Sequence, residues 1–207
     1  MGSATEEKWI KHYSSGHEIL LVGEGDFSFA ACLARAFGNA SNMVATSLDS
    51  AETLRIKHPT AAQNLLLLED KGCTIIHQVD ASSMSEHHLL SQRIFDRIVF
   101  NFPHAGFIMS EHTSYQISLH RDVVGGFLKN AYEMVKATGE VHITHKTTYP
   151  FSEWKIVQLA EEVGLELVEK VKFYLYQYPG YENKRGDGHR SNGSFPVGES
   201  STFKFAK

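Results

Sequence analysis

The stretch "VGEGDFSFA", residues 22–30, decides the fold, because a glycine turn in it joins a strand pattern to a helix pattern. Residues 19–22, "ILLV", form an apolar run that ends at Gly23 and Gly25. After the turn, one apolar stripe with helical spacing runs through Phe29, Cys32, Leu33, Ala36 and Phe37, and Gly38 stops it. Strand, glycine turn and helix in this order are typical of a nucleotide-binding loop. This loop also carries two acids, Glu24 and Asp26, where a phosphate would have to sit.

The rest of the chain continues the alternation of strand and helix patterns. Strands are expected at 18–23, 43–48, 74–79, 95–102 and 139–145. Helices are expected between them, among them 116–137 and a segment from Ser152 as N-cap to Gly164 as stop. Alternating strands and helices predict a parallel sheet, and the nearly all-apolar early strands predict that both its faces are covered. The pair Gly125-Gly126 inside a helix predicts close packing on a neighbour.

The last part of the chain has a different pattern. Residues 165–171 and the segment "STFKFAK", 201–207, alternate apolar and polar side chains, as half-buried strands do. We expect an antiparallel strand pair that closes the sheet, with the polar residues 179–199 as a long loop over its edge. The whole chain, 1–207, is predicted to be one α/β domain with a partly flexible N-terminal segment, 1–16.

Composition excludes several classes of protein. No apolar run approaches the roughly 20 residues that cross a membrane, and the start "MGSATEEKW" has no signal core. Two cysteines give no disulfide framework, so an intracellular protein is expected. The net charge of −4 does not fit a protein that holds nucleic acid by bulk electrostatics. The twelve histidines include no helical HxxxH or HExxH pair, and no metal site is predicted.

The acids of the glycine loop restrict the ligand. In an open α/β sheet, ligands bind beyond the carboxyl ends of the strands, where Asp49 and Asp80 also stand. An acid at the position of Asp49 accepts the two hydroxyls of a ribose, although it could also be a helix cap. Glu24 or Asp26 near a phosphate would cost about 4 kcal/mol per like-charge pair at an effective dielectric of about 20. A ligand with a ribose, a cationic centre and no phosphate, such as S-adenosylmethionine, removes the conflict.

Longer motifs carry a resemblance to a known family. "ILLVGEGDFSFA", "ATSLDS", "FDRIVFNFPHAG", "GEVHITHK" and "YPGYENKRGDG" followed by "GESSTFKF" resemble the ribosomal-RNA uridine-N3-methyltransferase-like proteins, particularly the plant members. The resemblance covers about residues 11–205. It implies a Rossmann-like class I methyltransferase fold, with a seven-stranded, mostly parallel sheet, an antiparallel last strand and helices on both faces. It also implies S-adenosyl-L-methionine as the methyl donor.

The resemblance assigns site residues by position. Its cofactor-binding residues are Gly23, Glu24, Gly25, Asp26, Phe27, Ser28, Asp49, Ser50, Asp80 and Ala81. Asp49 becomes the ribose acid and Asp80-Ala81 the adenine end. The motif beside the transferring methyl, and hence the catalytic set, is Asn101, Phe102, Pro103 and His104.

The residue types of this motif suit methyl transfer to a planar ring. An Asn101 amide can donate and accept at once, Phe102 can stack on a ring, and Pro103 fixes the turn. His104 is a candidate base for a ring N–H, because histidine titrates near neutral pH. Each also has a plainer interpretation: a turn asparagine, a core phenylalanine and a surface loop histidine.

Candidate substrate contacts come from two places. His145 and Lys146 end the fifth expected strand, and Tyr181, Lys184 and Arg185 stand in the 179–199 loop. The loop cations could hold a substrate phosphate, or the loop could simply be flexible and solvated. We expect this loop and the 101–104 turn to form opposite walls of one substrate pocket.

The predicted function is S-adenosylmethionine-dependent N-methylation of a uracil-type ring, with uridine N3 in ribosomal RNA as the expected substrate. The alternatives are a small pyrimidine-like or other heterocyclic metabolite, or a non-catalytic module that kept the fold. The net negative charge weakens the case for ribosomal RNA as the substrate, because an RNA enzyme needs a local basic patch or a recruiting partner. The expected location is nuclear or nucleolar for an RNA substrate and cytoplasmic otherwise, with no membrane association.

Overall fold

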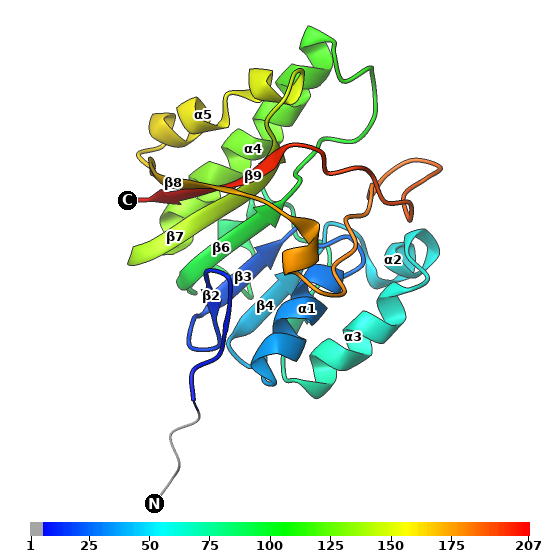
Figure 1. The fold of residues 1–207 in the computed structure, drawn as a ribbon, viewed down its shortest axis with the longest axis vertical. Helices are drawn as coiled ribbons and strands as arrows, with labels where there is room; N and C mark the ends of the chain where they lie inside the picture. The colour runs from blue at the N-terminus through cyan, green and yellow to red at the C-terminus, as the bar shows by residue number, and fades with distance from the viewer. Residues whose placement is uncertain (1–5) are drawn as a thin grey trace, which may run out of the picture.

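The computed structural model describes residues 6–207, which form a seven-stranded sheet with helices on both sides (Figure 1). The strand order is β5-β4-β3-β6-β7-β9-β8. The strands are β3 (Ile19–Val22), β4 (Met43–Thr46), β5 (Thr74–Ile76), β6 (Phe95–Asn101), β7 (Val135–Lys146), β8 (Glu166–Lys172) and β9 (Ser200–Ala206). The pairs from β5 through β7 are parallel, and β9 runs antiparallel to both neighbours. The fold class expected from the sequence is confirmed.

Two layers of helices cover the sheet because its early strands are apolar on both faces. The helices are α1 (Ser28–Phe37), α2 (Ala51–Lys57), α3 (Ala61–Asp70), α4 (Ser114–Met134) and α5 (Ile156–Glu162), with 3-10 turns η1 (Met84–Glu86), η2 (Phe151–Trp154) and η3 (Leu175–Gln177). Leu20 and Val22 of β3 join the core beneath α4 and α5, whereas Ile19 and Leu21 join the core beneath α1 and α3. Successive strand residues point to opposite faces, so one short strand serves both cores.

The N-terminal region adds a small two-stranded hairpin, β1 (Trp9–Ile10) and β2 (Tyr13–Ser14). Tyr13 is buried, and its hydroxyl lies 3.1 Å from Nδ1 of His142 in β7. Part of the segment predicted to be flexible, 1–16, is therefore packed on the sheet, and residues 1–5 lie outside the described residues.

The segment predicted as one helix from Ser152 to Gly164 is divided. Residues 151–154 form η2, and α5 begins at Ile156 after Lys155, whose φ of 52° is left-handed. The break accompanies burial of Trp154, whose ring stacks 4.2 Å from that of His120. Ser152 is therefore not the N-cap of this helix.

Of the paired glycines in α4, Gly126 has the close packing that the sequence predicts, whereas a Cβ on Gly125 would meet only Leu159 at 4.0 Å. A Cβ on Gly126 would lie 2.6 Å from Oγ of Ser82, so a larger residue would push the helix away from the 80–83 turn. Among the described residues, no helix is long and apolar enough to span a membrane.

The carboxyl ends of β3, β4 and β6 open on one edge of the sheet, and residues 179–199, here called the late loop, cross that edge. Ser28 at the start of α1 bonds Glu182 in both directions, at 3.2 and 2.9 Å. Lys57 at the end of α2 donates to the carbonyl of Gly186 at 3.3 Å. These bonds hold the late loop over the strand ends.

Candidate active site

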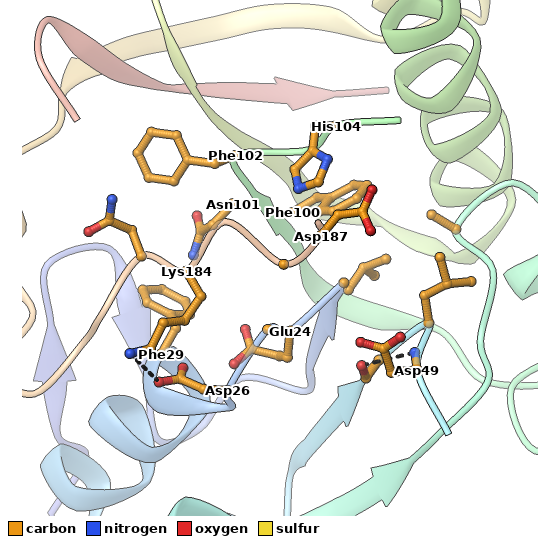
Figure 2. A pocket seen from close by; sticks show the side chains of 18 of the residues that line it. Glu24, Asp26, Phe29, Asp49, Phe100, Asn101, Phe102, His104, Lys184 and Asp187 are labelled. Atoms are coloured by element: carbon orange, nitrogen blue, oxygen red, sulfur yellow. Dashed lines mark hydrogen bonds and ion pairs between the residues drawn. The ribbon is translucent and has the colours of Figure 1, made fainter. Parts of the chain in front are cut away.

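A first cavity of about 460 Å³ lies beyond these strand ends, beneath the late loop (Figure 2). It brings together most of the residues predicted to bind the cofactor or act beside it. Predicted residues in its lining are Gly23, Glu24, Gly25, Asp26, Asp49, Asp80, Ala81, Asn101, Phe102, His104, Tyr181 and Lys184. Phe27, Ser28 and Ser50 stand behind this lining.

The glycine loop, residues 23–28, is held in a shape that few side chains allow. Gly23 has a φ of +66°, and a Cβ there would lie 2.4 Å from the ring of Phe100. Phe27 has a φ of 60°, which is uncommon for a non-glycine residue, and its side chain is buried under α1. Phe27 and Ser28 therefore shape and anchor the loop and lie outside the cavity lining.

Both acids of the glycine loop are buried and bond the first amides of α1. Glu24 Oε2 accepts from the N–H of Ala30 at 3.1 Å, and Asp26 Oδ1 accepts from that of Ser28 at 3.0 Å. These amides are the groups a pyrophosphate would use, so the chain's own carboxylates occupy an anion site. Burial, with the charge of Asp26 adding to it, raises the pKa of Glu24 to about 8. A cationic ligand would favour its ionised form.

Asp49 is not the cap of α2. Ser50 takes that role, since its side chain accepts from the N–H of Thr53 at 3.1 Å. Asp49 points into the cavity, with Oδ1 2.8 Å from Nζ of Lys57 (Figure 2). Ser50, which was predicted to bind the cofactor, lies outside the cavity lining. Asp49 lies in the lining, and only its Oδ1 is paired with Lys57, so its other carboxylate oxygen is available to a ligand.

Asp80 stands farther from its strand than the sequence predicts, because β5 already ends at Ile76. Its Oδ1 accepts from the N–H of Ser82 at 2.8 Å and closes a turn. The residue is exposed at the edge of the cavity, with Ala81 beside it.

Asn101, the last residue of β6, carries an unsatisfied donor. Its Nδ2 is buried and has no hydrogen-bond partner among residues 6–207. A buried polar group without a partner costs about 1–3 kcal/mol, so this amide indicates a ligand acceptor in the cavity. The next residue, Phe102, is held at a φ of 48° with its ring against Phe173 and Phe195 at 5.6 and 5.2 Å. Backbone strain of this kind is common at functional sites.

His104 has both ring nitrogens engaged. Its Nε2–H donates to the carbonyl of Arg185 at 2.6 Å, and its Nδ1 accepts from the N–H of Gly106 at 3.0 Å. Burial also lowers its pKa, which keeps the ring neutral. In this conformation His104 ties the 101–104 turn to the late loop, and neither nitrogen is free to take a proton.

Lys184 lies on a different side of the site from the one the sequence predicts. Its Nζ is 3.9 Å from Oδ2 of Asp26 and 2.6 Å from Glu182, inside the first cavity and above Gly25. Tyr181 also belongs to this cavity, with its ring 5.1 Å from that of Phe29. The buried acid of the glycine loop attracts the cation, so Lys184 and Tyr181 line the first cavity, among the residues predicted to bind the cofactor.

A second cavity of about 230 Å³ adjoins the first through Phe102, His104 and Phe195, which line both. Its other residues are Pro103, Phe107, Glu111, His145, Lys146, Phe151, Trp154, Arg185 and Pro196. Pro103 of the 101–104 turn and Arg185 of the late loop thus line one cavity together with Lys146.

His145 is a packing residue in this cavity. Its Nε2 donates to the carbonyl of Phe151 at 3.1 Å, and its ring lies 4.2 Å from that of Trp154. Burial lowers its pKa to about 4, so it stays neutral. Its ring forms part of the wall and has no free donor to offer a substrate.

Sequence reasoning missed His58. This buried histidine follows α2 and lines the first cavity, and its Nε2 has no partner among the described residues. Its other nitrogen lies 3.4 Å from Oδ1 of Asn192 in the late loop. A lone histidine between a helix and a proline carries no pattern that would have identified it. Over residues 6–207, no group of three or more metal-binding side chains occurs.

Comparisons with known proteins identify the family of the chain. The family model described as BMT5-like, rRNA (uridine-N3-)-methyltransferase BTM5-like, matches residues 20–185. An uncharacterized protein of Arabidopsis thaliana is 56% identical over 204 residues, which are 97% of this chain and 98% of that protein. The 25S rRNA (uridine(2634)-N(3))-methyltransferase of Saccharomyces cerevisiae is 24% identical over 229 residues, 85% of this chain and 68% of its own length.

A solved structure gives the fold. The methyltransferase from Pyrococcus furiosus superposes with a TM-score of 0.56 at 15% identity, covering 92% of this chain and 74% of its own.

Proposed function

The chain belongs to the BMT5-like family and is an S-adenosylmethionine-dependent methyltransferase, and from this premise we propose that it methylates N3 of a uridine in ribosomal RNA. The proposal rests on the junction of the two cavities, where Asn101, Phe102 and His104 stand between a site for the cofactor and a site for a small planar ring.

The first cavity fits the cofactor by its chemistry. Glu24 and Asp26 are buried acids that suit a cationic ligand, and Asp49 offers a carboxylate oxygen to ribose hydroxyls. The unpaired Nδ2 of Asn101 gives a donor at the inner end. When bound, S-adenosylmethionine supplies a methyl group on a positively charged sulfur.

The second cavity fits one ring. Its volume of about 230 Å³ is below the roughly 300–1,000 Å³ of pockets for drug-sized ligands. Its walls include Phe102, Phe107, Phe151 and Phe195, as expected of a pocket that stacks a base flipped out of an RNA strand. Such walls exclude water and orient the ring nitrogen toward the first cavity, and this alignment is the main demand of an in-line methyl transfer.

One observation favours a second candidate, a small pyrimidine-like metabolite. The chain has a net charge of −4, and RNA binding draws much of its affinity from cations that meet phosphates. An RNA substrate would therefore need a local basic surface or a recruiting protein, and it would place the protein in the nucleus or nucleolus.

The test supplies both substrate classes to the same protein. The wild type and Asn101→Ala are incubated with methyl-labelled cofactor and either total cellular RNA or a metabolite extract, and the products are identified by mass spectrometry. We expect labelled N3-methyluridine in digested ribosomal RNA with the wild type and at least a tenfold loss with Asn101→Ala. Label that enters a small molecule and no RNA would reject the ribosomal-RNA proposal in favour of the second candidate.

A further inference from the structure

The second cavity contains two cations that form no ion pair among the described residues. Lys146 ends β7 and Arg185 comes from the late loop, and both line the cavity. Within residues 6–207, neither side chain has a carboxylate within 4.0 Å or a hydrogen bond to a protein acceptor. Charged side chains in a cavity normally pair, so unpaired ones indicate a ligand of opposite charge.

The surroundings of Lys146 hold its charge in one place. Its Nζ lies 4.9 Å from the ring centre of Phe151 and 5.1 Å from that of Phe195, in contact with the faces of two aromatic walls. Lys146 is partly buried beside these rings, and partial removal from water strengthens the action of its charge on a ligand.

The other titratable side chains of the cavity are weak or engaged bases. Glu111 is the carboxylate of its lining, and it accepts a hydrogen bond from Nε2 of His120 at 2.9 Å. Burial acts to raise the pKa of Glu111, but this bond lowers it below the usual value. Both nitrogens of His104 are engaged, and Nε2 of His145 donates to a carbonyl. A ring N–H that must lose its proton meets two cations here, and the side chains that could accept the proton, Glu111 and His145, are weak bases because their pKa values are lowered.

We propose that the second cavity binds the uracil ring as its N3 anion, stabilised by Lys146 with Arg185 as the second cation, so that the proton leaves to water. The inference rests on the proposed function and names Lys146 as a further catalytic residue. The N3–H bond breaks and its proton goes to water, the freed electron pair forms the bond to the methyl carbon, and the carbon–sulfur bond breaks with its pair staying on sulfur. One positive and one negative charge become two neutral products.

Among the described residues, the charged and titratable groups of the cavity that face Lys146 are Glu111, Arg185, His104 and His145. Burial lowers the pKa of Lys146, the charge of Glu111 opposes that change, and the charge of Arg185 adds to it. His104 and His145 have lowered pKa values and stay neutral. At saturating cofactor, where the ionisation of Glu24 no longer changes cofactor occupancy, the pH dependence of turnover should therefore report the ring's own ionisation.

The first experiment measures that ionisation directly, without methyl transfer. A short single-stranded RNA containing one 5-fluorouridine is the probe, because its fluorine NMR shift reports whether N3 carries a proton. Bound to the wild type, the probe should ionise about one pH unit or more below its value free in solution. Lys146→Gln should remove that shift, Lys146→Arg should keep most of it, and Lys129→Gln, at an exposed position on α4, should match the wild type. An equal shift in the wild type and Lys146→Gln would overturn the assignment.

The second experiment compares turnover on two rings. Lys146→Gln should slow methylation of a uridine RNA at least tenfold near neutral pH, and much less with the more acidic 5-fluorouridine or at higher pH. A merely structural loss would lower both rates equally, and that result would overturn the proposal. Cofactor affinity, measured in parallel, shows that the variant is folded. If the wild type neither binds nor methylates either RNA, the proposed function fails as well; if it methylates both while Lys146→Gln keeps the wild-type profile, only this inference fails.

Discussion

Nζ of Lys184 lies 3.9 Å from Oδ2 of Asp26, with both side chains almost fully buried, so the late loop is fastened by charge to the glycine loop. Lys184 also bonds Glu182, whereas Asp26 has no second cation within 4.0 Å among residues 6–207. The pair therefore forms part of the wall of the first cavity.

The first prediction is that this pair couples the two loops energetically. Lys184→Met should lower the free energy of unfolding by about 1–3 kcal/mol, because it leaves Asp26 buried without its cation. Asp26→Asn alone should also destabilise, and the double variant should lose less than the sum. Denaturant unfolding of the four proteins measures this, and strict additivity would show that the 3.9 Å contact carries no energy.

The second prediction is that Asp49 contributes to cofactor binding, whereas its neighbour Ser50 contributes to stability. Asp49→Ala should weaken S-adenosylmethionine binding by about 1.5–3 kcal/mol with the fold intact, since a charge-assisted acceptor to the ribose is lost. Ser50→Ala is the matched control: it removes the α2 cap and should cost about 0.5–2 kcal/mol of stability with little change in affinity. Calorimetric titration and thermal unfolding of both variants test this, and unchanged affinity in Asp49→Ala would refute the ribose assignment.

The third prediction concerns Glu24 and pH. Its pKa in the folded protein is about 8, above the value in an unfolded chain, so the carboxyl is mostly neutral at pH 7 and ionises as pH rises. A cationic cofactor favours the ionised form, so binding should release a proton and tighten as pH rises from about 6 to 9. NAD should bind more weakly than S-adenosylmethionine, and the difference should grow as pH rises, because Glu24 repels a pyrophosphate once it ionises.

Glu24→Gln is the control for this pH effect. The cofactor's own amine titrates identically with both proteins, so the difference in slope between the wild type and Glu24→Gln isolates the carboxyl. The wild type should also lose stability as pH rises from about 4.5 to about 8, the range between its unfolded and folded pKa values, and Glu24→Gln should not. Identical slopes for both proteins, measured by calorimetry across this range, would exclude Glu24 as the linked group.

The fourth prediction is that His104 positions and does not take the proton. His104→Gln can still donate to the carbonyl of Arg185 and should keep most of the activity, whereas His104→Ala loosens the late loop and should lose at least tenfold. If His104 were the catalytic base, both variants would lose activity to the same extent. A histidine ionisation in the pH profile of kcat/KM that vanishes in His104→Gln would make His104 the base after all.

The sequence predicted the fold because the periods of its apolar residues are local signals. Residues 22–30 join a continuous apolar run to a helical apolar period, and the position of Asp49 at the end of the next strand places it at the same edge of the sheet. The break after Trp154 was not predictable, because its cause is a stack on His120, which is distant in sequence. His58 was missed for the same reason, since burial against the late loop gives it a place in the site.

The late loop shows most clearly what the sequence could not predict. Its residues Lys184 and Arg185 are adjacent cations in a polar stretch, and nothing local assigns them to different cavities. Lys184 meets the buried acid Asp26 in the first cavity, and Arg185 lines the second. Successive side chains of an extended segment point in opposite directions, but which one meets the acid depends on the tertiary register.

The last prediction uses these two neighbours as controls for each other. Arg185→Ala should raise KM for the substrate about tenfold or more and leave cofactor affinity within about twofold, because the guanidinium lines only the second of the two cavities. Lys184→Ala should weaken cofactor binding and change substrate KM far less, since its ammonium belongs to the first cavity. Asn101→Ala should lower kcat chiefly, because its amide stands where the two ligands meet. Cofactor affinity by calorimetry and methyl transfer on one common substrate separate the three effects. Full transfer activity in Arg185→Ala would mean that the late loop only covers the cofactor, and its assignment to the substrate wall would be wrong.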